Sequence, residues 1–362
     1  MHKFGGAALA DAAGVTHAAR IVRMRRTAPS VIVASALVGV TDALLALVRE
    51  AEIGNTHSVV AGVAGLRERH SVVLRDVLDA AQAEVNGRHG PTTDLEHEQR
   101  PLDAMFESLD NELTSIAEGR EASPAALDSV LSYGERLSAR LFAAALSSAM
   151  PVQHIDATDV IRTDGRFGNA APDIAATAAC AREHVLPALQ AGKVVIVPGF
   201  IGAGRDGELV TLGRGGSDLT ATLLARALGA REVHLWKDVP GILTADPRVV
   251  PTARVVAQLT VREAAELAYY GAKVLHPRAL MPIVEGMRVI VRPFATPEAE
   301  GSVITVRASS GGSPVRALSA IQSQAIVTVS GNGMIGVPGV AARTFGALAK
   351  AGTSVSLISQ AS

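Results

Sequence analysis

The stretch from Val210 to Ala230, VTLGRGGSDLTATLLARALGA, places three glycines, a cation, a hydroxyl and a carboxylate at the start of an apolar helix. Glycines let backbone N–H groups approach an anion closely, and the helix adds partial positive charge at its N-terminus. Arg214 can grip a carboxylate or phosphate with two hydrogen bonds. Asp218 lies in the first helical turn, where it could also be an ordinary cap. The segment therefore predicts either an anion site or a capped flexible turn.

Similar polar and glycine-rich residues follow three other predicted strands. Lys3 to Gly6 (KFGG) ends a very short first strand, Ser35 to Thr41 ends the strand that begins near Ser30, and Gly199 to Gly202 follows the apolar run from 193 to 197. Ligands of open α/β sheets bind beyond the carboxyl ends of the strands. Together, these strand ends indicate one anion-binding cleft.

Two further loops combine acids, bases and glycines. Residues 166–170 read RFGNA, and residues 236–248 read WKDVPGILTADPR. Taken alone, each loop could be a ligand contact or a charged surface loop, and both alternatives stay open at this point.

The elements that must position these residues alternate between strands and helices. A helix is predicted over 11–26 and a buried strand over 30–38, and residues 41–150 are mostly helical with breaks near 86–91. Beyond them, short apolar strands separated by helices predict a mostly parallel sheet covered on both faces.

The C-terminal part changes composition. Residues 307–314 (RASSGGSP) are typical of a flexible linker, and the following residues predict a strand, a loop, a helix and a strand. A lone β-α-β segment of this size buries little surface, so we expect it to dock on the large domain, to pair with another chain or to be a fragment of something longer.

Composition excludes several classes of protein. The formal net charge of the 362 residues is −1 without a long basic run, which argues against nucleic acid as a partner. No apolar run reaches the roughly 20 residues that span a bilayer, and the N-terminus lacks a secretory signal pattern. A single cysteine, Cys180, suits a reducing compartment. These observations predict a cytoplasmic protein without a membrane partner.

The sequence matches the dinucleotide-binding pattern GxGxxG at two places. In the first, residues 202–207 are followed by a strand-like run, so a hairpin turn is favoured over the helix that this pattern requires. In the second, residues 331–336 join a predicted strand to a helix, but no acidic residue follows to bind a ribose. A dehydrogenase remains an alternative. The sequence has no P-loop, and its histidines and cysteine lack zinc-ligand spacing.

Eight motifs in order resemble the aspartokinases of the amino acid kinase family: KFGG, VIVASALVGVTD, SYGERLSARL, RTDGRFGNA, VPGFIGA, TLGRGGSDLTA, WKDVPGILTADPR and YYGAKVLHPRA. The resemblance implies a three-layer αβα sandwich with a mostly parallel central sheet. It also implies that the γ-phosphoryl group of ATP moves to the side-chain carboxylate of L-aspartate, giving 4-phospho-L-aspartate. This reaction is the first step of lysine, threonine and methionine biosynthesis.

The resemblance also implies a division of the chain. Residues 1–297 would form the catalytic domain, 298–319 a linker, and 320–362 part of an ACT regulatory module with a βαβ, ferredoxin-like pattern. Paired ACT units of the family bind end-product amino acids, commonly across a dimer. We therefore expect a homodimer or higher homo-oligomer. Because the sequence has part of one ACT unit where the family has a pair, we also expect feedback inhibition to be impaired or rewired.

Residue roles follow by resemblance alone. Lys3 is expected to stabilise charge on the transferring phosphoryl group, and Asp218 to organise the cations of the active site. The positions expected to bind aspartate are Ser35, Thr41, Glu135, Phe167, Arg214 and Ser217. The positions expected to bind the nucleotide are Gly5, Gly6, Lys237, Asp238, Leu243, Arg248 and Lys273. Mg²⁺ is expected to enter with ATP, with no metal ligand assigned to a protein side chain.

Two further alternatives stay open. Ala7 and Ala8 stand where the family usually has hydroxyl residues, so the chain could be a weakened regulatory chain that only binds aspartate or nucleotide. A sister acyl-phosphate kinase of the same fold is the other alternative. Retention of Lys3, Arg214 and Asp218 favours an active aspartokinase.

Overall fold

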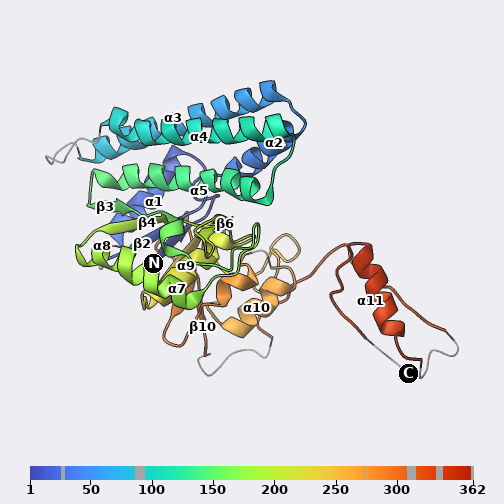
Figure 1. Cartoon of the computed structure of the whole chain (residues 1–362). Coiled ribbons are helices and arrows are strands. Elements are labelled where there is room, and N and C mark those ends of the chain that lie inside the picture. Colours follow the sequence, from blue (N-terminus) through green and yellow to red (C-terminus); the bar gives the residue numbers. More distant parts are fainter. Residues whose placement is uncertain (26–28, 86–93, 273, 308–314, 332–336, 360–362) are drawn as a thin grey trace. The chain divides into compact units, whose positions relative to one another are not determined.

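The computed structural model describes residues 1–25, 29–85, 94–272, 274–307, 315–331 and 337–359. Its main feature is an eight-stranded sheet in the order β3-β4-β2-β1-β7-β9-β10-β8 (Figure 1). Neighbouring strands run parallel except for β9 and β10. This confirms the mostly parallel sheet that the sequence predicts. The strands are β1 (His2–Phe4), β2 (Val31–Ala34), β3 (Val152–His154), β4 (Val194–Pro198), β7 (Glu232–Lys237), β8 (Gln258–Thr260), β9 (Arg288–Pro293) and β10 (Ser302–Thr305).

Helices cover both faces of the sheet. Successive side chains of a strand point to opposite faces, and β2 shows the consequence. Ile32 and Ala34 pack in one hydrophobic core, whereas Val31 and Val33 pack in the other. The three-layer αβα sandwich is confirmed.

The first core lies among the five helices nearest the N-terminus; Figure 1 shows α3, α4 and α5 stacked together. These helices are α1 (Ala12–Met24), α2 (Val40–Glu52), α3 (Thr56–Val85), α4 (Leu95–Gly119) and α5 (Pro124–Ser147). The second core includes side chains of later helices and loops. The later elements are α6 (Ala157–Val160), α7 (Ile174–Cys180), the π-helical η1 (Ala181–Val185), α8 (Leu186–Gln190), α9 (Gly216–Ala227), α10 (Val261–Tyr269) and the 3₁₀ turn η2 (Pro277–Leu280).

Local sequence explains where several helices begin. Asp11 caps α1 by accepting a hydrogen bond from the N–H of Gly14. Ser123 caps α5 in the same way, and Pro124 occupies the first turn, where a missing N–H costs nothing. The predicted break near 86–91 falls between α3 and α4, in residues outside the described part of the chain.

The first GxGxxG match forms a hairpin. Strands β5 (Ile201–Ala203) and β6 (Leu209–Thr211) pair antiparallel, with residues 204–208 as the turn between them. This confirms the turn prediction and removes the dinucleotide interpretation there. Residues 332–336 of the second match lie outside the described residues.

The chain divides into two compact units, Met1–Ala320 and Ile321–Ser362. The second unit contains helix α11 (Val340–Lys350), as predicted. The two predicted flanking strands are absent from its described residues, 321–331 and 337–359. A strand needs a partner for its backbone groups, and this unit buries too little surface to supply one: Ile326 is 95% and Leu357 82% exposed. No described helix has the length and hydropathy of a membrane span.

Candidate active site

The register of the central strands places three predicted site residues on one face of the sheet. Lys3 of β1 pairs with Val33 of β2 and with Leu235 of β7. Side chains alternate along a strand, so residues two apart point to the same face. Ser35 lies two residues after Val33 and Lys237 two residues after Leu235, so both share the face of Lys3. Helix α9 packs against β1, β2 and β7. The sheet therefore directs two cations and a hydroxyl toward α9.

Asp218, in the first turn of α9, receives both lysines. Its Oδ1 lies 2.7 Å from Nζ of Lys3, and its Oδ2 lies 2.6 Å from Nζ of Lys237. Burial favours a neutral Asp218, but the two ammonium groups outweigh it and lower the pKa of this carboxyl to about 2. Burial also lowers the pKa of Lys3, and Asp218 opposes that shift. We call Lys3, Asp218 and Lys237 the charge cluster.

The turn before α9 is built from glycine for a steric reason. Gly215 has a φ of 75°, a conformation that side chains rarely adopt, and a Cβ there would lie 2.4 Å from Cβ of His276. The turn leaves Arg214 exposed, whereas Ser217 is buried beside Asp218. Backbone amides at the start of α9, Arg214 and the charge cluster together make an environment that favours anions.

Glu135 of α5 is the second buried carboxyl group. Burial raises its pKa to about 8, although the backbone of Ala36, Lys3 and Ser217 oppose this shift. Its Oε2 is buried without a hydrogen-bond partner among the described residues. The adjacent Gly134 lets α5 approach the chain after β2, since a Cβ there would lie 2.8 Å from Cβ of Ala36. Lys3, Glu135, Ser217 and Asp218, predicted from distant segments, thus come together.

The RFGNA loop presents Phe167 at the surface, with 40% of the residue exposed. Thr41, in the first turn of α2, is partly exposed. Two residues that the sequence analysis did not single out hold this loop, Asp128 of α5 and Arg278 of η2. The sequence signal that could have identified Asp128 is a carboxylate among the apolar residues of a predicted helix.

The predicted nucleotide positions are less tightly organised. Asp238 is exposed directly after β7, and Leu243 forms an isolated β-bridge with Val255. The guanidinium of Arg248 pairs with Asp246 at 2.6 Å, and its side chain is 82% exposed.

The remaining nucleotide positions differ in their placement. Gly5 lies near the charge cluster, since a Cβ there would be 3.4 Å from Nζ of Lys3, whereas a Cβ at Gly6 would lie 3.2 Å from the carbonyl oxygen of Ala36. Lys237, also predicted to contact nucleotide, lies with its Nζ 2.6 Å from Oδ2 of Asp218. Lys273 lies outside the described residues.

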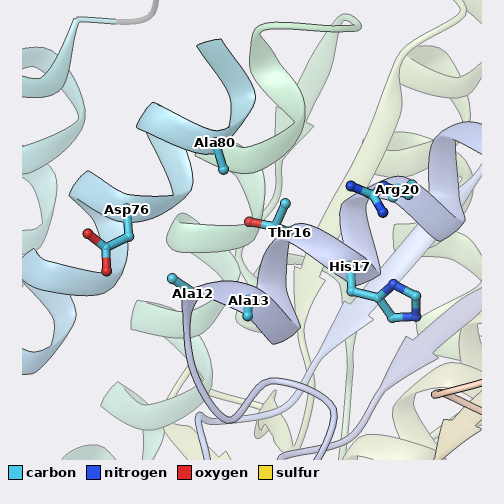
Figure 2. A pocket seen from close by; sticks show the side chains of 7 residues that line it. All are labelled: Ala12, Ala13, Thr16, His17, Arg20, Asp76 and Ala80. Carbon is cyan, nitrogen blue, oxygen red and sulfur yellow. The ribbon is translucent and has the colours of Figure 1, made fainter. Parts of the chain in front are cut away.

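A hollow of about 440 Å³ lies on the other helical layer, between α1 and α3 (Figure 2). It shares no residue with the charge cluster, so it is not the predicted site. Its lining residues are Ala12, Ala13, Thr16, His17, Arg20, Asp76 and Ala80. Among the residues that the structure describes, no three His, Cys, Asp or Glu side chains gather as metal ligands.

Comparison with known proteins gives a consistent result. The model of the amino acid kinase family matches residues 1–293, and that of the ACT domain matches residues 327–362. The lysine-sensitive aspartokinase 3 of Escherichia coli is 36% identical over 367 residues, with 98% of this chain and 75% of that protein covered. A bifunctional aspartokinase/homoserine dehydrogenase of Haemophilus influenzae is 31% identical, and this chain spans 43% of it.

A solved structure has the same fold. The crystal structure of E. coli aspartokinase III in complex with aspartate and ADP superposes with a TM-score of 0.80 at 33% sequence identity. The match covers 99% of this chain and 76% of that one.

Proposed function

Because the chain belongs to the amino acid kinase family, and within it to the aspartokinases, we propose that it phosphorylates the side-chain carboxylate of L-aspartate. A carboxylate oxygen attacks the γ-phosphorus of ATP, the bond to the β,γ-bridging oxygen breaks, and ADP leaves with that electron pair. The products are 4-phospho-L-aspartate and ADP. The attacking carboxylate is already ionised at neutral pH, so the step requires no general base.

The charge cluster is the observation that carries this proposal. Bringing a carboxylate to a polyphosphate costs on the order of 4 kcal/mol per charge pair at 4 Å and intermediate dielectric. Lys3 and Lys237, held in place by Asp218, supply fixed positive charge where the anions meet. We assign the catalytic roles to Lys3 and Asp218, with Lys237 as a second cation at the same carboxylate.

The aspartate substrate carries groups that match the remaining residues. Glu135 has a buried oxygen without a partner, which suits the α-ammonium group. Arg214 suits the α-carboxylate, because a guanidinium can donate two parallel hydrogen bonds to it. The other residues assigned to aspartate are Ser35, Thr41, Phe167 and Ser217.

The nucleotide is assigned to the loop after β7. Asp238, Leu243 and Arg248 lie on this segment, with Gly5 and Gly6 at the end of β1 and Lys273 beyond the described residues. Both oxygens of Asp218 are already paired with lysines, so Mg²⁺ fits as an ion that enters on the phosphates of ATP. Bound there, it would neutralise phosphate charge during the transfer.

Residues 1–297 are assigned as the catalytic domain, 298–319 as the linker and 320–362 as the ACT-like segment. The exposed apolar side chains of the second unit favour a homodimer or higher homo-oligomer. The single free cysteine, Cys180, suits the cytoplasm.

One experiment separates this function from its alternatives. The protein is incubated with ATP, Mg²⁺ and L-aspartate, and any acyl phosphate is trapped with hydroxylamine. We expect aspartyl hydroxamate. Hydroxamate from another amino acid only would assign a sister acyl-phosphate kinase, and nucleotide or aspartate binding without hydroxamate would assign a regulatory binder.

A further inference from the structure

Asp128 is a fully buried carboxylate that no role assigned above uses. It lies on α5 and is 1% exposed. Its Oδ2 accepts hydrogen bonds from the N–H of Gly168 at 2.8 Å and of Thr211 at 2.7 Å. Its Oδ1 accepts from the hydroxyl of Thr211 at 2.8 Å. A buried carboxylate is tolerated when its oxygens are hydrogen-bonded in this way.

The two segments that Asp128 joins both lead to residues assigned to aspartate. Gly168 directly follows Phe167 in the RFGNA loop. Thr211 is the last residue of β6, three residues before Arg214. A direct backbone hydrogen bond, from the N–H of Ala170 to the carbonyl of Thr211 at 2.9 Å, also links the two segments.

Arg278 holds the same two segments from another element. From η2, its Nη2 donates to the carbonyl of Ala170 at 2.6 Å. Its Nη1 donates to the side-chain oxygen of Asn169 and to the carbonyl of Leu212. The loop and the end of β6 are therefore clamped by an acceptor group on α5 and a donor group on η2.

We propose that Asp128 is a positioning residue that sets the affinity for aspartate. With Arg278, it fixes the RFGNA loop against the start of the glycine turn, so that Phe167 and Arg214 face the substrate at a constant separation. This inference rests on the proposed function. It predicts an effect on aspartate that exceeds any effect on ATP, because the assigned nucleotide loop follows a different strand.

Four variants test the clamp. Asp128→Ala removes all three acceptor contacts. Asp128→Asn keeps one oxygen for both N–H donors and offers an amide donor to the hydroxyl of Thr211, which can rotate to accept it. Thr211→Val removes only the hydroxyl contact. Ser123→Ala is the matched control, because it removes the N-cap of the same helix without touching the loop.

Steady-state kinetics with both substrates give the main readout. We expect Asp128→Ala to raise KM for aspartate about 10-fold to 100-fold, as displaced substrate contacts commonly do, with KM for ATP changed less than about threefold. In Asp128→Asn, KM for aspartate should stay within about threefold of the wild-type value. In Thr211→Val it should fall between the values of Asp128→Asn and Asp128→Ala, and in Ser123→Ala it should equal the wild-type value. Amide hydrogen exchange should accelerate at Gly168 and Thr211 in Asp128→Ala only.

Several outcomes would overturn the clamp. These are an unchanged KM for aspartate in Asp128→Ala, equal rises for both substrates, or a defect in Asp128→Asn as large as in Asp128→Ala. If Asp128→Ala does not fold, KM for aspartate is compared between Thr211→Val and Ser123→Ala. A KM in Thr211→Val no higher than in Ser123→Ala would overturn the clamp. Absence of aspartyl hydroxamate from the wild type would instead defeat the proposed function, while hydrogen exchange at Gly168 still tests the clamp.

Discussion

The charge cluster and the loop of residues 238–248 are joined in the chain, because Lys237 of the cluster directly precedes the loop, but they differ in construction. In the cluster, Lys3 and Asp218 are each 5% exposed and their charges are paired within the protein. In the loop, Asp238 is exposed and Arg248 pairs with Asp246 in solvent. Both regions carry opposite charges at hydrogen-bond distance.

This difference separates two kinds of contribution to phosphoryl transfer. Fixed charges in a buried site are oriented before the substrate arrives, so they stabilise the transition state without reorganisation at the moment of reaction. Exposed pairs are screened by water and contribute little fixed field. We therefore expect the cluster to govern turnover and the loop to govern nucleotide affinity modestly.

Lys3→Ala is the strongest test of that division. We expect kcat to fall about 10³-fold, the loss typical of one preorganised electrostatic group. The nucleotide Kd, measured by calorimetry, should change less than about threefold, because the lysine acts in the transition state. Lys193→Ala is the matched control, since that lysine donates to Gln153 away from the cluster. A kcat near the wild-type value would remove Lys3 from catalysis.

Lys237→Met tests whether the second cation shares the work. Its side chain is more exposed than that of Lys3, at 16% against 6%, so its field is weaker. We expect kcat to fall about 10-fold to 100-fold, with Asp218 still paired to Lys3. If KM for ATP rises while kcat is unchanged, Lys237 belongs with the loop as a nucleotide contact.

Glu135→Gln tests the buried carboxyl beside the cluster through stability. The folded-state pKa of Glu135, about 8, exceeds its ordinary value of 4.5. The folded protein therefore binds this proton more tightly than the unfolded chain. Its contribution to stability is full below pH 4.5 and is lost as pH rises to about 8.

The measurement is the unfolding free energy in urea at pH 5, 7 and 9 without substrates, for the wild type and the glutamine variant. We expect the unfolding free energy of the wild type to fall relative to that of the variant as pH rises. A pH-independent difference would contradict the raised pKa.

Arg248→Ala should have the smallest effect. Because its guanidinium is exposed and pairs with Asp246, we expect KM for ATP to rise about fivefold or less and kcat to stay unchanged. A kcat loss approaching that of Lys3→Ala would erase the distinction between the two regions.

The sequence predicted the sheet and most of the cluster because both follow from local patterns. Local sequence patterns identify the short β-branched strands, their glycine-rich carboxyl ends and the capped start of α5. Lys3, Ser35 and Lys237 share a face because of strand register, which a single sequence does not contain. The pairing of Lys237 with Asp218 was missed for that reason.

Other features depend on contacts between remote segments. Asp128 meets Thr211 across 83 residues, and Arg278 meets Ala170 across 108. No spacing rule links such pairs. The two strands expected around α11 are absent from residues 321–331 and 337–359, because a strand needs a pairing partner for its backbone groups.

Helix α5 carries both Asp128 and Glu135, and their separation of seven residues has a geometric consequence. Seven residues make almost two turns, about 10 Å along the axis. If Glu135 binds the ammonium group of aspartate and Asp128 holds the RFGNA loop, as proposed, α5 would fix the distance between that group and the loop. Inserting one residue between them would rotate one group by about 100° relative to the other. The spacing of the two carboxyl groups along α5 can therefore change only together with their relative orientation.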